Sequence, residues 1–194
     1  MEMNIIPKIK AWVLNREARA KQSEPERVIQ SLSLKPGDRV ADIGAGGGYF
    51  AMELAGKVGS EGKVFAVESD RTLLKELERT MKTRRIDSIE TVQTSGGVPN
   101  LPHKNLDLIF FRNIYHHLND RIVYFTELKN LLKPAGRVAV IDYLPATSIF
   151  QCIQILGHYT PPHTIQQEME ASGYVMTAQF GFLPRQSFTI FSQK

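Results

Sequence analysis

The chain contains a single cysteine, a single tryptophan and no run of apolar residues long enough to cross a membrane. One cysteine, Cys152, excludes an intrachain disulfide and is typical of proteins in a reducing compartment. Lys8, Lys10 and Arg16 interrupt the apolar residues near the N-terminus, so this segment does not resemble the core of a signal peptide. We therefore expect a cytoplasmic protein with an ordinary hydrophobic core.

Internal repeats and low-complexity tracts are also absent from the 194 residues, which indicates one domain. Residues 1–22 mix apolar and basic side chains and predict a helical arm, while residues 23–194 form the main domain. Ser23, Pro25 and Glu26 predict that a helix begins here with Ser23 as its N-cap.

The formal net charge is +4, and much of the basic excess lies in residues 71–85. No aromatic residues alternate with those cations, as a site for single-stranded nucleic acid would require. We interpret this segment as the solvated face of a helix, which argues against a nucleic-acid partner.

The most informative segment is VADIGAGGGYF, residues 40–50. Its first four residues predict a buried strand, because a parallel strand covered on both faces is largely apolar. Four glycines then lie within five positions, and an apolar helical pattern begins at Phe50. Glycines let the backbone approach a ligand closely, and the N–H groups of a helix N-terminus favour an anionic group. The segment predicts a nucleotide-type cofactor site.

Two common glycine-rich motifs do not fit this segment. The dinucleotide-binding motif has glycine at its sixth position, where the helix packs closely on the strand. Counting from Gly44, that position holds Tyr49. The phosphate-binding P-loop requires a lysine followed by serine or threonine, and the first lysine after the loop is Lys57.

A second motif is KVFAVESD, residues 63–70. It predicts a short buried strand that ends at Glu68, 24 positions after Gly44, close to the spacing of one strand–helix–strand unit. A carboxylate at this strand end can accept hydrogen bonds from both hydroxyls of a ribose. The alternative is a solvated carboxylate, but the preceding loop favours the ribose role. Ser69 and Asp70 predict the N-cap of the next helix.

The pattern acidic-x-Gly-x-Gly-x-Gly, from Asp42 to Gly48, resembles motif I of the class I S-adenosylmethionine-dependent methyltransferases. The phrase NIYHHL, residues 113–118, likewise resembles the NVLHHL of the ubiquinone-biosynthesis and arsenite-methyltransferase-like branch. The resemblance covers residues 30–194 and implies S-adenosyl-L-methionine as cofactor. It also implies the ribose role for Glu68.

The same resemblance implies roles for residues after two further strands. Relatives often place an acidic residue after the third strand to accept a hydrogen bond from the adenine amino group, and here Ser95 takes that place, unless it is only part of a polar turn. Asn113 matches a residue whose backbone carbonyl receives the methionine ammonium group; the alternative is an ordinary loop residue. The expected cofactor-binding residues are Asp42, Gly44, Ala45, Gly46, Gly48, Glu68, Ser69, Ser95, Gly96 and Asn113.

The remaining pattern predicts strands that alternate with helices. Residues 133–136 predict a turn, and the last two strands are close enough for a hairpin. This order resembles the α/β, Rossmann-like doubly wound sheet of seven strands, mostly parallel with an antiparallel C-terminal strand. The later strands are expected at residues 90–94, 106–111, 138–143, 175–182 and 187–192, with a helix at residues 164–171.

Two adjacent histidines, His116 and His117, are the candidate catalytic residues. On a helix, neighbouring side chains diverge and cannot both face one ion, and no third ligand stands at zinc spacing, so we expect no metal site. A neutral imidazole could accept a substrate proton, because imidazole titrates near neutral pH. The alternative is a hydrogen-bonded histidine that contributes only to packing.

Motifs of several other methyltransferase classes are missing. Residues 112–115 lack the Pro-Pro of the enzymes that act on amino groups of adenine or glutamine, and Cys152 lies in an apolar stretch that indicates packing. Only Asp142 is placed for the carboxylate cluster of metal-dependent catechol-type enzymes. With an apolar segment at residues 144–162 as a pocket wall, we predict metal-independent methyl transfer to an O, N or C atom of a small, partly apolar molecule.

Two alternatives remain open at this point. The basic balance would suit an RNA methyltransferase, whose affinity would fall steeply with salt. A cofactor-binding protein without catalytic activity could have the same fold, because fold does not determine function. The sequence leaves the oligomeric state open, a homodimer included.

Overall fold

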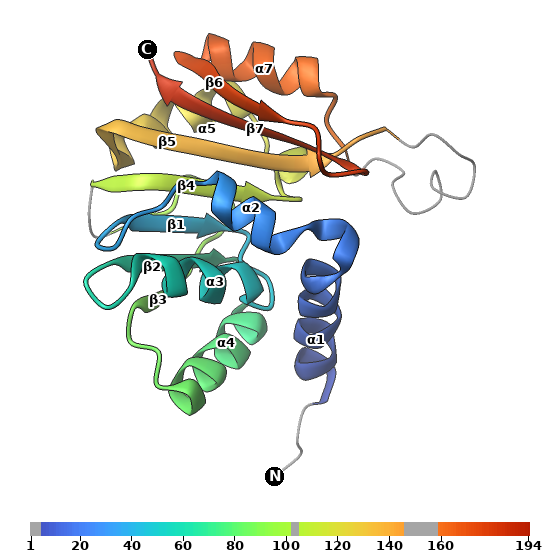
Figure 1. Ribbon diagram of the computed structural model, residues 1–194, viewed down its shortest axis with the longest axis vertical. Coiled ribbons are helices and arrows are strands. Elements are labelled where there is room, and N and C mark those ends of the chain that lie inside the picture. Colours follow the sequence, from blue (N-terminus) through green and yellow to red (C-terminus); the bar gives the residue numbers. More distant parts are fainter. Residues whose placement is uncertain (1–4, 102–104, 146–158) are drawn as a thin grey trace. The chain divides into compact units, whose positions relative to one another are not determined.

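The computed structural model describes residues 5–101, 105–145 and 159–194 (Figure 1). The chain divides into two compact units, Met1–Pro102 and His103–Lys194. Each unit contains both strands and helices, which largely alternate along the chain from β1 to β6. Over the described residues, no helix has the length and apolar character needed to span a membrane.

The first unit contains three strands in parallel register, with β2 in the middle. Ile43 pairs with Val67, and Glu68 pairs with Gln93, so the three strands end at the same edge. The strands are β1 (Arg39–Ile43), β2 (Lys63–Glu68) and β3 (Ile89–Gln93), and the helices are α1 (Ile5–Arg19), the short 3-10 helix η1 (Lys21–Ser23), α2 (Pro25–Ser31), α3 (Tyr49–Val58) and α4 (Arg71–Arg84).

Apolar residues of β1 and β2 form the core of this unit with α3 and α4. The β2 residues Val64, Phe65, Ala66 and Val67 are fully buried, as the continuous apolar run predicts. Helix α3 buries Phe50, Leu54 and Val58, and α4 buries Leu73, Leu74 and Leu77. Each such side chain contributes about 1.5–3 kcal/mol on burial, which holds the glycine-rich loop between two rigid elements.

The two predicted helix starts have different outcomes. Asp70 is the N-cap of α4, and its Oδ1 accepts a hydrogen bond from the Thr72 N–H at 2.8 Å, as predicted. The prediction that Ser23 caps α2 is wrong. Ser23 belongs to η1, its hydroxyl donates to the Glu17 carbonyl at 2.8 Å, and Glu24 takes the cap position with φ 40°. Ser23 therefore closes the end of α1 instead of starting α2.

The second unit combines parallel and antiparallel pairing. β4 and β5 are parallel, whereas β7 is antiparallel to both β5 and β6. The hairpin of β6 and β7 confirms the predicted one. The elements are β4 (Leu106–Arg112), η2 (Tyr115–His117), α5 (Arg121–Leu128), η3 (Lys129–Leu131), β5 (Leu132–Tyr143), α7 (Pro162–Ala171), β6 (Tyr174–Phe180) and β7 (Gln186–Gln193). Cys152 and most of the predicted pocket wall at residues 144–162 lie outside the described residues.

Residues 133–136 form a bulge within β5, so the predicted turn before a shorter strand is wrong. Leu106 pairs with Leu132, and Leu108 pairs with Arg137, so four residues of β5 lie opposite one residue of β4. That one residue, Asp107, accepts hydrogen bonds from the Lys133 ammonium at 2.8 Å. The Pro and Gly of the segment interrupt the pairing without ending the strand.

The seven strands form one sheet in the order β3-β2-β1-β4-β5-β7-β6. Parallel pairs dominate, and the antiparallel pairs involve the C-terminal strands β6 and β7. This topology confirms the predicted fold class, an α/β Rossmann-like doubly wound sheet.

An aromatic cluster holds α5 against the second unit. The ring of Phe125 is fully buried, and its centroid lies 5.2 Å from that of Phe111 and 5.3 Å from that of Tyr115. The Tyr174 hydroxyl donates to the Phe125 carbonyl at 3.0 Å. This cluster supports η2 and the histidines in it.

We expect Phe125→Ala to lower the free energy of unfolding by about 3–5 kcal/mol, because the rings packed around Phe125 cannot collapse into the large cavity. Chemical denaturation measures this change. Val123→Ala, on the exposed side of the same helix, is the matched control and should shift stability by no more than about 0.5 kcal/mol. Equal effects of the two substitutions would contradict the assignment of Phe125 to the core.

Candidate functional site

The glycine-rich loop links β1 to α3 at the strand ends of the first unit. Gly44, Gly46 and Gly48 have φ of 76°, 55° and 82°, a left-handed conformation that residues with a Cβ rarely adopt. The N–H groups of Gly44 and Ala45 both donate to the Val67 carbonyl, at 2.9 and 3.0 Å. Glycine therefore occurs at every second residue because the backbone of the loop is left-handed at each of these positions.

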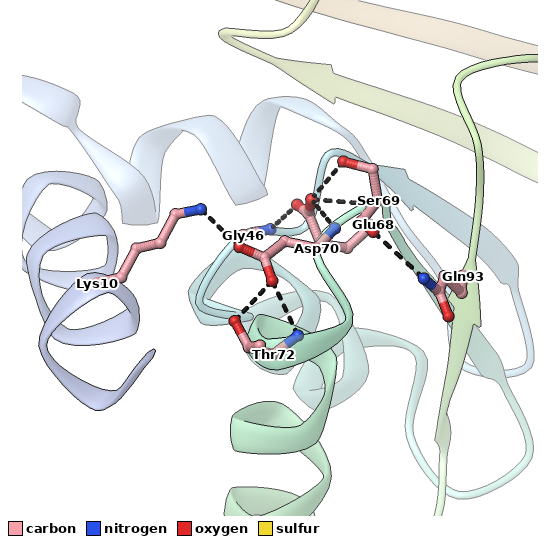
Figure 2. A network of polar contacts seen from close by, with 7 residues as sticks. All are labelled: Lys10, Gly46, Glu68, Ser69, Asp70, Thr72 and Gln93. Carbon is pink, nitrogen blue, oxygen red and sulfur yellow. Dashed lines mark hydrogen bonds and ion pairs between the residues drawn. The ribbon is translucent and has the colours of Figure 1, made fainter. Parts of the chain in front are cut away.

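Glu68 connects the end of β2 to this loop (Figure 2). Its Oε2 accepts a hydrogen bond from the Gly46 N–H at 2.9 Å. Its Oε1 accepts from the Ser69 N–H at 2.8 Å, the Ser69 hydroxyl at 3.1 Å and the Asp70 N–H at 3.0 Å. Oε1 thus accepts three hydrogen bonds and Oε2 only one among the described contacts, so Oε2 has the greater capacity for a ligand.

Helix α1 packs directly on the glycine-rich loop through Asn15. The Asn15 side-chain amide donates to the Gly47 carbonyl at 2.9 Å, and its Oδ1 accepts from the Tyr49 N–H at 3.1 Å. A Cβ at Gly47 would lie 2.6 Å from the Ala11 carbonyl oxygen, so glycine is required here by the approach of α1. The guanidinium of Arg19 lies 5.2 Å from the centroid of the Tyr49 ring.

A second contact joins α1 to the segment after β2 (Figure 2). The Lys10 ammonium lies 2.6 Å from Asp70 Oδ2, and Thr72 bonds the other oxygen of the same carboxylate. These contacts, Lys10 first, hold the pKa of the Asp70 carboxyl well below its usual range. Their stabilising contribution is therefore present at neutral pH and is lost as the pH falls through the folded-state pKa. Since both side chains are partly exposed, the ion pair matters more for placing α1 than for stability.

The turn after β3 carries Ser95 and Gly96. Ser95 is exposed, and Gly96 has φ 108° and donates its N–H to the Thr94 hydroxyl at 3.2 Å. The Thr94 N–H donates to the Glu68 carbonyl at 3.1 Å, which ties this turn to the end of β2. Asp42 lies in β1 with only 3% of its surface exposed. The roles assigned to Ser95, Gly96 and Asp42 stay predictions.

Asn113 follows β4 in the second unit and has a left-handed backbone, φ 56°. Its N–H donates to the Ile141 carbonyl at 2.8 Å, and its side-chain amide donates to the Tyr143 hydroxyl at 2.9 Å. Its side-chain oxygen accepts from Gln186. Asparagine tolerates this conformation better than most residues, and its side-chain hydrogen bonds fix the loop. The ligand role of its backbone carbonyl stays a prediction.

The two histidines have different surroundings. His116 Nδ1 lies 2.7 Å from Asp142 Oδ1, and both side chains are buried, with 3% and 0% exposed. The ring of His117 lies against that of His116, with centroids 4.1 Å apart, but His117 is an exposed residue. A carboxylate that accepts the Nδ1 proton leaves Nε2 as the basic nitrogen. Within the described residues, no group of three or more potential ligands is placed to hold a metal ion.

Sequence reasoning missed Asn15, Lys10 and the pairing of Asp142 with His116. Asn15 and Lys10 come from a helix more than thirty residues before their partners, and no local pattern relates them to the loop. The signal that could have found Asn15 is weak: it is an uncharged polar side chain that follows the apolar residues 11–14. The sequence places Asp142 after a strand, but no local pattern relates it to His116.

Comparisons with known proteins agree with this geometry. A family model described as methyltransferase domain matches residues 40–136, half of the chain. The chain is 25% identical over 116 residues to the ubiquinone/menaquinone biosynthesis C-methyltransferase UbiE of Teredinibacter turnerae, covering 59% of this chain and 47% of that protein. It is 28% identical over 116 residues to phosphoethanolamine N-methyltransferase 1 of Zea mays, covering 59% and 22% respectively. The chain spans about half the length of most of the curated relatives it matches, or less.

The fold has a near full-length counterpart among solved structures. A SAM-dependent methyltransferase from Aquifex aeolicus matches 95% of this chain and 97% of its own, with a TM-score of 0.80 and 21% identity. At 21% identity, this match shows only that the two chains share a fold. Membership of the family rests on the family model, which matches half of the chain. The chain therefore belongs to the methyltransferase domain family and has the fold of the class I methyltransferases that use S-adenosylmethionine.

Proposed function

We propose that this protein is an enzyme that transfers a methyl group from S-adenosylmethionine to an O, N or C atom of a small, partly apolar molecule, without a metal ion. The observation that carries the proposal is the Glu68 carboxylate, held at the end of β2 by four donors and bonded to the glycine-rich loop. Such a fixed acceptor beside a glycine-rich loop suits a ribose.

The state of the loop amides favours an adenosyl sulfonium over a dinucleotide. The N–H groups of Gly46, Gly48 and Tyr49 are bonded to Glu68, the Ala45 carbonyl and Asn15. A pyrophosphate at this helix N-terminus would need those donors for itself. S-adenosylmethionine carries no phosphate, so it can occupy the loop without breaking these bonds.

The four donors also define how Glu68 would receive the ribose. One hydroxyl can donate to Oε2, which accepts only the Gly46 N–H among the described contacts. A second bond, at Oε1, requires the Ser69 hydroxyl to rotate away while the two backbone N–H groups remain. Ser69 thereby gains a role as a replaceable donor, in line with its place among the predicted cofactor-binding residues.

Methyl transfer requires few catalytic groups from the protein itself. The bound cofactor supplies an activated methyl group together with its own leaving group. The residues of the chain then orient the acceptor and take up its proton where the acceptor is an alcohol or a phenol. We assign Nε2 of His116 as the acceptor of that proton, since Asp142 orients this ring through Nδ1. His117 lies on the exposed side of the pair and has no catalytic role in this proposal.

We expect Glu68→Ala to weaken the affinity for S-adenosylmethionine by roughly 100-fold, because hydrogen bonds to a charged group are worth about 1.5–3 kcal/mol each. Isothermal calorimetry with the cofactor measures this loss. Glu90→Ala, on the neighbouring strand β3, removes a carboxylate outside the loop and should bind as the unchanged protein does. An unaltered affinity of Glu68→Ala would disprove the ribose assignment.

Asn15→Ala should weaken cofactor affinity by about 5- to 30-fold, since it removes two hydrogen bonds of about 1 kcal/mol each that shape the loop. The same calorimetric titration tests it. Asn130→Ala makes the equivalent change at an exposed position of η3 and serves as the control. Normal cofactor affinity of Asn15→Ala would contradict the role of α1 in shaping the loop.

His116→Ala should lower kcat by about 100- to 10,000-fold with little change in cofactor affinity, as expected for loss of a general base. The rise of kcat with pH that a titrating base produces should disappear in this variant. His163→Ala, at an exposed position of α7, is the control. A lowered kcat that keeps the pH profile of the unchanged protein would show that His116 acts through packing.

The proposal as a whole is tested in two steps. Calorimetry with S-adenosylmethionine separates a cofactor-binding protein from one that does not bind it. Transfer of a labelled methyl group to a metabolite extract, with total RNA as a parallel acceptor, then identifies the acceptor class. Binding without transfer to either would indicate a non-catalytic protein, and label in RNA alone would replace the small-molecule assignment.

A further inference from the structure

Helix α1 buries small side chains and exposes several large apolar ones, whereas an ordinary surface helix buries its large apolar residues. Its buried residues are the small Ala11 and Ala18, 8% and 6% exposed, with the half-buried Asn15 between them. These positions follow each other at intervals of three or four residues and therefore share the face that packs on the first unit. The described contacts of α1 with the first unit are made by hydrogen bonds, by these small side chains and by Leu14, which lies against Gly46.

Four other large apolar residues of the helix are exposed. Ile6, Ile9, Trp12 and Val13 are 75%, 54%, 58% and 48% exposed. Ile6, Ile9 and Val13 are also spaced by three or four residues, so they form one continuous strip along the helix, with Trp12 at its border. Single exposed apolar residues are ordinary, but a continuous strip on one element marks an interaction surface.

Helix α1 is also basic. Helix α1 carries four cations, Lys8, Lys10, Arg16 and Arg19, against one carboxylate, Glu17, which gives a local net charge of +3. The Arg16 guanidinium lies 5.3 Å from the centroid of the Trp12 ring, at the border of the strip. A partner must therefore be apolar where it meets the strip and anionic around it.

We propose that α1 binds the surface of an anionic lipid bilayer, with Ile6, Ile9 and Val13 entering the boundary between headgroups and acyl chains. A basic helix that exposes a strip of large apolar residues with tryptophan at its border has the composition of an interfacial helix, and each cation adds attraction to anionic headgroups. Tryptophan favours that depth because its ring is apolar and its N–H is polar. Self-association through this face is disfavoured, because two copies would bring charges of +3 and +3 together.

The binding is peripheral, and it does not depend on the proposed catalytic function. The contacts of Asn15 and Lys10 hold α1 on the first unit, so attachment through the outer strip leaves the packing face in place. The experiment therefore reads lipid binding and cofactor binding separately.

The test uses the full chain with vesicles of phosphatidylcholine alone or mixed with phosphatidylglycerol. Co-sedimentation measures partition, and Trp12, the one tryptophan in the sequence, reports insertion through its emission. We expect partition into the mixed vesicles to exceed that into phosphatidylcholine by at least about tenfold, to fall as salt is added, and to shift the Trp12 emission to the blue.

Two pairs of variants locate the surface. Ile9→Ser combined with Val13→Ser should lower partition by about tenfold, and serine has nearly the helix propensity of the residues it replaces. Lys8→Glu combined with Arg16→Glu should abolish the preference for phosphatidylglycerol. The control, Val123→Ser combined with Val175→Ser, removes apolar side chains that are 58% and 43% exposed on α5 and β6, and it should partition normally. Circular dichroism and calorimetry with S-adenosylmethionine verify that each variant remains folded.

Three results would overturn the proposal. The first is absence of partition into either kind of vesicle by the unchanged protein. The second is equal partition of the α1 variants and the control, which would place any lipid contact elsewhere. The third is a dimer in light scattering that the Ile9→Ser and Val13→Ser changes convert to a monomer, which would identify a second copy as the partner of the strip.

Discussion

The hydrogen bond from the Gly46 N–H to Glu68 Oε2 is the contact on which the site of the first unit depends. It joins the glycine-rich loop to the end of the neighbouring strand, so the shape of the loop and the orientation of the carboxylate are fixed together. The Ser69 and Asp70 N–H groups hold the other oxygen from the opposite side. A binding site that needs little rearrangement loses less entropy when its ligand arrives.

Helix α1 extends this preorganisation beyond the two motifs. Asn15 satisfies a carbonyl and an N–H of the loop at once, and Lys10 reaches the cap of α4. Because small residues mediate the contact, the helix approaches so closely that Gly47 has no room for a Cβ. Several large apolar residues of the helix are then exposed, and the packing of one face explains the exposure of the other.

Much of the fold could be predicted because the signals for its strands and helix caps lie within short stretches of the sequence. Residues 64–67 are continuously apolar since both faces of β2 are covered, and Asp70 is recognisable because capping involves residues two apart. Ser23 and residues 133–136 carry equally clear local signals, and both were misread. Ser23 bonds back to α1, and Lys133 bonds across to Asp107, so long-range partners overrode the local preference.

By itself, the sequence determined the elements of the fold, the glycine-rich loop and the acidic strand end, since each depends on residues close together along the chain. Only the tertiary structure decided which side of α1 meets the loop, that Asp142 lies beside His116, and that Asn113 is held by Tyr143 and Gln186. Those contacts join residues 26 to 73 positions apart, where no periodicity or motif relates one partner to the other. Packing of whole elements sets them, because a buried polar group must find its partner wherever the fold places one.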